Sequence, residues 1–277
     1  MKDYTKDLPE HEVKYIGEND LFLEIFEGEN PKKDNSNRPP LLFVHGAYTG
    51  SWMWSKYIPH FIQDGWKCYV MNMRSHYRSR VMDMTRITFE DYLDDIKEVI
   101  AECGVPPILI GFSMGGILSQ KVAEILELAG LVLVDSSVSK EVLEEVPYKD
   151  IAPVVPELIV PAPTREEQSS QDESADDIAF QRKYLATESF LAINAFSAHF
   201  GATGISIDGR LISCPCLVIN AVNSDDDDRR GRATAAHLHA EYKGLWGTTH
   251  TGLLVGQRYR EAVDAILEWL EKGIIGS

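Results

Sequence analysis

One serine stands in a sequence context that strongly restricts how the chain around it can fold. The segment Gly111-Phe112-Ser113-Met114-Gly115-Gly116 directly follows the apolar run Ile108-Leu109-Ile110 and directly precedes a stretch with helical spacing of apolar residues. So short a connection between a strand and a helix places the serine on a very sharp turn, where the residues two positions before and after it must be small. Gly111 and Gly115 meet that requirement. The pattern therefore predicts a strand, a tight turn that exposes Ser113, and a helix whose amino end favours developing negative charge.

Strands and helices are expected to alternate along most of the chain. The apolar, β-rich runs are typical of buried parallel strands, and they lie at Leu41 to Val44, Cys68 to Met71, Ile108 to Ile110, Leu131 to Val134 and Leu217 to Ile219, with Leu245-Trp246 as a last strand. Helical spacing occupies 54–63, 89–103, 115–128, 232–242 and 257–272. Val13 to Ile16 and Leu21 to Phe26, joined by Glu18-Asn19-Asp20, suggest an opening hairpin. These patterns predict an α/β fold with a mostly parallel central sheet and helices on both faces.

The segment from 139 to 210 interrupts this alternation. It contains a proline-rich run, then the polar stretch Thr164 to Asp177, which is typical of a loop, and then Ala179 to His199, whose apolar content indicates helices. We expect residues 1–138 and 211–277 to form one core domain and residues 139–210 to form an inserted cap. Its helices would lie over part of the core domain.

A histidine near the carboxyl end is the candidate base for Ser113. His250 lies in the small-residue loop Gly247 to Gly252, between the last expected strand and the last expected helix. His45 precedes the serine in the chain and is expected to hold its own loop by hydrogen bonds rather than to transfer protons. The other histidines, His76 among them, have no neighbouring partner pattern, so surface or packing roles are expected for them.

Several aspartates compete for the role of the acid that orients the histidine. Asp225 is preferred by its spacing from the strand at 217–219, Asp226 comes next, and Asp135 at the end of the strand at 131–134 is an alternative position. The four consecutive aspartates from 225 to 228 repel one another, and they are expected to form a solvated acidic loop from which one side chain points inward.

The remaining candidate site residues lie just after the expected strands at 41–44 and 108–110. The backbone N–H of Ala47, after His45-Gly46, joins that of Met114 as a candidate pair of donors for an oxyanion. Trp52 and Phe112 are candidates for the wall of a substrate pocket, although aromatic residues at such positions are more often simple packing.

Charge and hydropathy exclude several classes of partner. The formal charge is −16, with Asp and Glu outnumbering Lys and Arg 43 to 27, which disfavours binding to nucleic acid or to anionic lipid. The amino-terminal residues are charged, and no apolar run is long enough to span a bilayer. We expect a cytoplasmic protein that acts on a small molecule and needs neither a metal nor an organic cofactor. Nothing in the sequence indicates an oligomeric state.

Taken in order, these residues resemble the α/β-hydrolase superfamily, from about Val13 to Leu270 apart from the inserted segment. His45-Gly46-Ala47-Tyr48-Thr49-Gly50-Ser51-Trp52-Met53-Trp54 is similar to a stretch of the methylesterase and hydroxynitrile lyase branch of small serine esterases. The resemblance implies a triad of Ser113, His250 and Asp225 or a neighbour, with Ala47 and Met114 as oxyanion donors. Two positions depart from the usual pattern: Ala221 and the aspartate run replace a glycine and a single aspartate, and Thr249 stands where glycine commonly precedes the histidine.

The expected reaction is cleavage of a carboxylic ester through an acyl-enzyme formed on Ser113. A C–C bond hydrolase, a lactonase or a cofactor-free perhydrolase would use the same residues. A receptor on a hydrolase fold, with little turnover, is an alternative of another class.

Overall fold

A twisted eight-stranded sheet runs through the residues described by the computed structural model, which are 2–29, 38–149, 158–166, 171–198 and 202–273. Its strands lie in the order β1 (Glu12–Ile16), β2 (Leu21–Phe26), β4 (Cys68–Met71), β3 (Leu41–Val44), β5 (Ile108–Phe112), β6 (Gly130–Val134), β9 (Cys216–Val222) and β10 (Glu241–Trp246). β1 pairs antiparallel with β2, and β2 pairs antiparallel with β4, while every other neighbouring pair is parallel. The predicted hairpin and parallel strands are confirmed.

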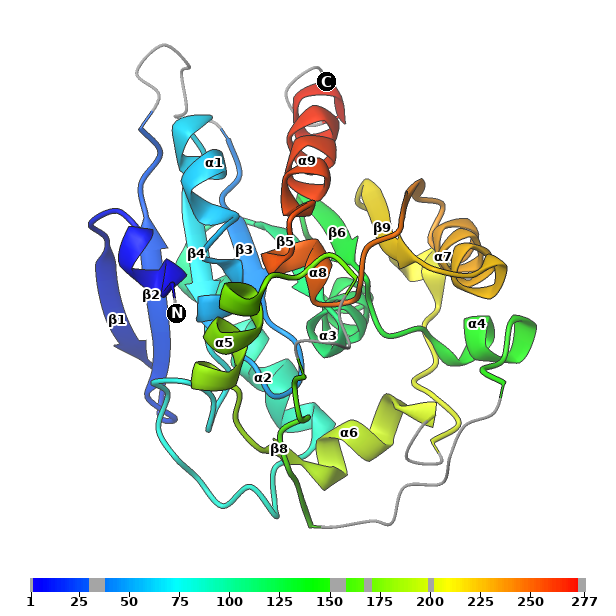
Figure 1. Cartoon of the computed structure of the whole chain (residues 1–277), viewed down its shortest axis with the longest axis horizontal. Coiled ribbons are helices and arrows are strands. Elements are labelled where there is room, and N and C mark those ends of the chain that lie inside the picture. Colours follow the sequence, from blue (N-terminus) through cyan, green and yellow to red (C-terminus); the bar gives the residue numbers. More distant parts are fainter. Residues whose placement is uncertain (1, 30–37, 150–157, 167–170, 199–201, 274–277) are drawn as a thin grey trace.

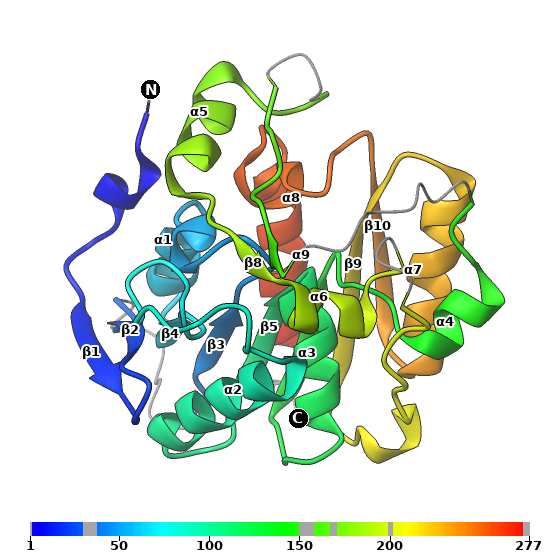
Figure 2. The same cartoon turned by 90° about the horizontal axis from the view of Figure 1, so that it is seen from below.

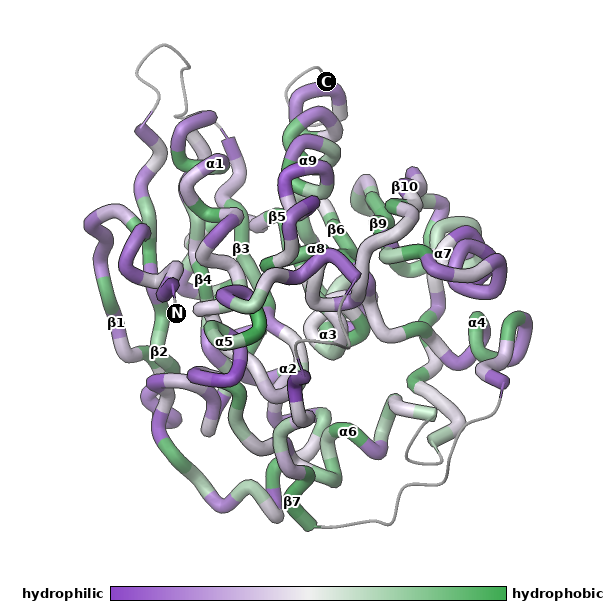
Figure 3. The backbone as a smooth tube through the Cα atoms, in the orientation of Figure 1, coloured by the Kyte–Doolittle hydropathy of each residue, from purple (hydrophilic) through white to green (hydrophobic). Residues whose placement is uncertain are grey.

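Helices cover both faces of this sheet (Figures 1 and 2). Side chains of α1 (Ile58–Gln63), α8 (Gly252–Val255) and α9 (Tyr259–Gly273) join one buried cluster, and those of α2 (Phe89–Cys103), α3 (Met114–Ala123) and α7 (Asp225–His237) join the other. The central strands are buried on both sides, so they are continuously apolar, as Figure 3 shows along β3, β5 and β6. The predicted fold class is confirmed.

The segment 139–210, which we call the insertion, leaves the sheet after β6 and returns to it at β9. Its described elements are α4 (Lys140–Glu145), β7 (Ile159–Val160), α5 (Ala175–Tyr184), β8 (Glu188–Ser189), α6 (Phe190–Phe196) and the 3-10 turn η5 (Gly209–Leu211). β7 and β8 form a separate two-stranded antiparallel sheet. Two further 3-10 turns, η1 (Tyr4–Asp7) and η2 (Ser51–Trp54), lie outside the insertion.

Three local predictions need correction. The aspartates from 225 to 228 form the first turn of α7 and not a loop, because Ser224 caps the helix and negative charge is favourable at a helix amino end. The polar stretch before residue 177 also becomes helical at Ala175, where Ser174 and Asp177 form a capping box. The helix expected over 54–63 is divided into η2 and a short α1.

No helix in the described ranges combines the length and the apolar character needed to cross a membrane.

Candidate active site

Ser113 occupies the sharp turn between β5 and α3. Its backbone angles, φ 53° and ψ −119°, are strained for a residue with a side chain, and such strain is typical of functional turns. A Cβ atom on Gly115 would lie 2.4 Å from the carbonyl oxygen of His45, and one on Gly111 would lie 2.5 Å from that of Gly115. The two glycines are therefore required by close backbone approach, as the sequence predicts.

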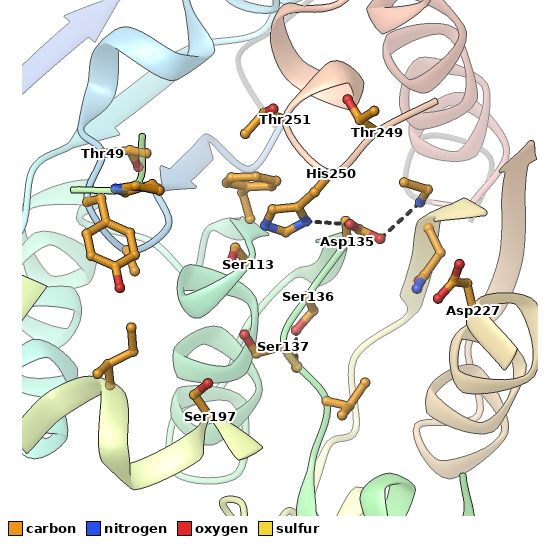
Figure 4. A pocket seen from close by; sticks show the side chains of 18 of the residues that line it. Thr49, Ser113, Asp135, Ser136, Ser137, Ser197, Asp227, Thr249, His250 and Thr251 are labelled. Atoms are coloured by element: carbon orange, nitrogen blue, oxygen red, sulfur yellow. Dashed lines mark hydrogen bonds and ion pairs between the residues drawn. The ribbon is translucent and has the colours of Figure 1, made fainter. Parts of the chain in front are cut away.

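His250 is held against Asp135 (Figure 4). Its Nδ1 forms a short hydrogen bond with Asp135 Oδ2, and its ring stacks on Phe112, with the ring centroids 4.6 Å apart. The second carboxylate oxygen of Asp135 accepts the backbone N–H of Ala221 at 2.9 Å. Asp135 follows β6 directly and its side chain is only 15% exposed, so the carboxylate has a fixed orientation toward the imidazole.

Asp225 and Asp226, the first and second choices for the acid, lie elsewhere. Asp225 is exposed at the start of α7, and Asp226 pairs with Lys149 at 2.6 Å. Within the described residues, no hydrogen bond or ion pair joins either carboxylate to His250. The geometry therefore favours the alternative position, Asp135, because the Ser224 cap directs the chain into α7 immediately after β9.

Ser113 and His250 line the same cavity, together with Ala47. No Ser113–His250 hydrogen bond is present in the described part of the chain, and such bonds are often long in free enzymes until substrate binds. No described group accepts a hydrogen bond from the N–H of Ala47 or of Met114, the first residue of α3. Two backbone donors near the serine are therefore available to a ligand.

His45 supports the loop that carries Ala47. Its Nε2 accepts the N–H of Met73 at 3.1 Å and its Nδ1 donates to the carbonyl of Gly46 at 2.9 Å, a pattern that requires the neutral ring. Burial and the nearby charge of His76 lower the pKa of His45 to about 3. A ring that stays neutral and has both nitrogens bonded is suited to holding the loop, in agreement with the expected role.

The cavity has a volume of about 660 Å³, within the range of small-molecule sites. Core loops form one wall, and the insertion forms the other with apolar side chains that include Leu185, Ile193 and Phe196. Its two arginines are paired: Arg165 with Glu173 and Arg230 with Asp227, each at 2.7 Å. The cavity therefore combines an apolar wall with two arginines that are each paired with a carboxylate.

The two aromatic candidates have different positions. Phe112 lines the cavity, as the sequence suggests. Trp52 is fully buried instead, packing against Phe180 and Tyr184 of α5 at centroid distances of 5.4 and 5.6 Å, and it is not among the described lining residues. The predicted pocket role of Trp52 is therefore corrected: its side chain packs under the insertion and does not line the cavity.

A polar network around the buried Glu188 joins the insertion to the Ala47 loop. Glu188 of β8 accepts hydrogen bonds from Tyr92 at 2.6 Å and from the backbone N–H of Tyr48 at 3.2 Å, and it pairs with His76 at 3.0 Å. His76 and Glu188 are 112 residues apart in the chain, so no local spacing could identify the pair. Of the two roles expected for His76, the surface role is wrong because the ring is fully buried, and the packing role is joined by an ion pair with Glu188.

The His76–Glu188 pair gives a testable pH dependence of stability. Burial alone would lower the pKa of His76, but the charge and hydrogen bond of Glu188 outweigh it and raise the pKa. Burial would raise the pKa of Glu188, but His76 and the donors around it lower the pKa. The stabilisation is therefore complete between the unfolded-state values of roughly 4.3 and 6.5, and it is lost as pH rises through the folded pKa of His76.

We expect Glu188→Gln to lower the free energy of unfolding by about 3 kcal/mol near pH 6, because it leaves one partner of a buried pair uncompensated. The difference from wild type should shrink toward pH 9, because His76 loses its proton, and with it the ion pair, as pH rises through its raised pKa. Urea denaturation at the two pH values measures it, with Glu268→Gln on the exposed face of α9 as the control. An equal loss at pH 6 and pH 9 would show that no ion pair is involved.

Comparison with known protein families agrees with the fold described above. The family model described as "Alpha/beta hydrolase family" matches residues 41–265. A search of curated proteins found no match.

Solved structures share the fold at low sequence identity. A carboxylesterase of Nitrososphaera gargenis is 15% identical with a TM-score of 0.66, and the match covers 96% of this chain and 100% of that one. A thermophilic esterase from Thermogutta terrifontis is 19% identical with a TM-score of 0.65, and the match covers 95% of this chain and 99% of that one. The monoacylglycerol lipase of Paleococcus ferrophilus is 17% identical with a TM-score of 0.66, and the match covers 90% of this chain and 98% of that one. Together with the family match, these neighbours support a hydrolase that acts on esters.

Proposed function

This chain belongs to the alpha/beta hydrolase family, and from that premise we propose that it hydrolyses carboxylic esters through an acyl-enzyme on Ser113. The observation that carries the proposal is the alignment of His250 by Asp135 in the cavity that also exposes Ser113. No metal or organic cofactor is needed for this reaction.

Each residue has a defined part in the proposed mechanism. His250 removes the proton of Ser113 as the hydroxyl attacks the ester carbonyl, and it later returns a proton to the leaving alcohol. Asp135 keeps the Nδ1 proton of His250 directed toward itself, so that Nε2 is the basic nitrogen. The N–H groups of Ala47 and Met114 bind the oxyanion. Water activated by His250 then releases the acid and restores Ser113.

The cavity favours a neutral ester with an apolar group. Leu185, Ile193 and Phe196 offer apolar contacts, and the two arginines are already bound to carboxylates. A substrate carboxylate would have to lose its hydration without gaining a free cation, which is unfavourable.

A pair of p-nitrophenyl esters tests both the activity and this preference. We expect turnover of the valerate ester, and a kcat/KM at least about tenfold lower for the similarly sized hemisuccinate, because the latter places a charge in the cavity. Intact mass spectrometry after a fluorophosphonate probe should show a single label, which peptide mapping should locate at Ser113.

The two measurements also separate the alternatives. A labelled protein with no turnover of any ester would favour a receptor or an unusual acyl substrate. A protein that is neither labelled nor active would contradict the proposed function.

A further inference from the structure

The loop that carries His250 is held from the insertion and not only from the core. His250 is flanked by Thr249 and Thr251, and Thr248 precedes them. All three hydroxyl groups contact the carboxylates of Asp172 and Glu173, which belong to the insertion. The contacts join residues about 76 positions apart in the chain.

The hydrogen bonds lie on both sides of the histidine. Thr249 Oγ1 lies 3.0 Å from Asp172 Oδ1 and 2.9 Å from Glu173 Oε2, and its backbone N–H donates to Asp172 Oδ1 at 3.2 Å. Thr251 Oγ1 donates to Glu173 Oε1 at 2.8 Å. Thr248 Oγ1 donates to Asp172 Oδ2. Thr249 Oγ1 also accepts the N–H of Gly252 at 3.0 Å, so the same hydroxyl supports the next turn.

Both carboxylates are themselves fixed. Asp172 is 6% and Glu173 7% exposed, and buried carboxylates form short, strong hydrogen bonds because they have little water to bind instead. Glu173 accepts a hydrogen bond from Arg165 at 2.7 Å and another from the side-chain amide of Gln181 at 2.5 Å. Asp172 approaches so closely that a Cβ on Gly252 would lie 2.4 Å from its Oδ1.

His250 has much less support of its own. Its side chain is 49% exposed, and its described contacts are the hydrogen bond to Asp135 and the stack on Phe112. The position of the imidazole therefore depends on the backbone of its loop. A displacement of about 1 Å in a catalytic group can lower a rate roughly 100-fold.

We propose that Asp172 and Glu173 are positioning residues, which fix the reactive placement of His250 through the hydroxyl groups of Thr249 and Thr251. This rests on the proposed function, in which His250 is the base. The hydroxyl of Thr249 contacts both carboxylates, so this one side chain connects the His250 loop to Asp172 and to Glu173. Because Glu173 also lines the cavity, this one carboxylate borders both the substrate space and the loop of the base.

Two substitutions of Thr249 separate positioning from packing. Thr249→Val keeps the shape and removes the hydroxyl, whereas Thr249→Ser keeps the hydroxyl and removes the methyl group. We expect the valine variant to lower kcat about 10-fold to 100-fold with KM changed less than about threefold, and the serine variant to retain kcat within about threefold. If the methyl packing alone matters, the serine variant loses more than the valine variant, and the proposal is overturned.

A double-mutant cycle guards against general unfolding. Thr249→Val and Glu173→Ala both remove the hydrogen bond between Thr249 Oγ1 and the Glu173 carboxylate, so their combined loss in kcat should be smaller than the product of the single losses. Independent, multiplicative losses would contradict the coupling. Melting temperatures of all variants show whether each one is folded.

A proton signal gives a readout that does not need turnover. The Nδ1 proton of His250 in a hydrogen bond to Asp135 should resonate far downfield in the ¹H NMR spectrum, and Asp135→Asn identifies it by loss. The signal should persist in Thr249→Ser and weaken in Thr249→Val. If no ester is cleaved but the signal follows this pattern, the proposed function fails and the positioning role stands. If Ser113-dependent turnover occurs and Thr249→Val matches wild type in both readouts, the positioning role fails.

Discussion

Ser113→Ala is expected to lower kcat/KM for a p-nitrophenyl ester at least about 10⁴-fold while leaving the folded structure intact. The hydroxyl is the only group removed, and no acyl-enzyme can form without it. The side chain of Ser113 provides no helix-capping hydrogen bond to α3, so its loss should change the melting temperature little. Initial rates at several ester concentrations and a thermal melt measure the two effects.

Ser137 offers a matched control for this experiment. It lines the same cavity as Ser113 but lies beyond β6 and not on the sharp turn. Ser137→Ala should retain ester turnover and fluorophosphonate labelling, while Ser113→Ala loses both. Undiminished turnover by purified Ser113→Ala would refute the proposed mechanism.

Asp135→Asn should lower kcat about 10⁴-fold, because an amide cannot hold His250 in the tautomer that leaves Nε2 basic. The substitution is nearly isosteric, and the retained oxygen can still accept the N–H of Ala221, so the loop should stay folded. The loss is expected in kcat and kcat/KM together, since substrate binding does not depend on the carboxylate. Steady-state kinetics on a neutral ester provide the measurement.

The aspartates at the start of α7 provide the comparison. Asp225→Asn and Asp226→Asn should each keep kcat within about twofold, because neither carboxylate contacts His250 in the described residues. A large loss in Asp225→Asn together with an active Asp135→Asn would reverse the assignment of the acid.

The sequence predicts the turn at Ser113 and the central strands because their signals are local. Glycines two residues either side of a serine, and apolar runs of strand length, report directly on the backbone they form. The acid is harder to assign, because β6 and β9 are neighbours and each is followed by an aspartate. The assignment depends on the path of the chain after each strand. Asp135 donates its N–H to the carbonyl of Ile219 in β9, whereas the Ser224 cap starts a helix at Asp225.

The contacts from the insertion lie beyond sequence reasoning for a different reason. Asp172 and Glu173 stand in a polar stretch that resembles a solvated loop, and Glu188 has no local pattern at all. Each becomes informative only when it is buried against a partner far along the chain, as Glu188 is against His76. The one signal in the sequence is Thr249, where the chain departs from the pattern of the superfamily that it resembles.

The double use of Glu173 limits how this protein can acquire a new specificity. Grafting the insertion of a relative onto this core would change the substrate wall and, in the same step, remove the partners of Thr249 and Thr251. Chimaeras of this kind should therefore be folded but catalytically poor unless Asp172 and Glu173 are kept in the grafted insertion. Ile193 and Phe196 line the cavity from α6, away from the threonine contacts, which makes them better starting positions for directed evolution.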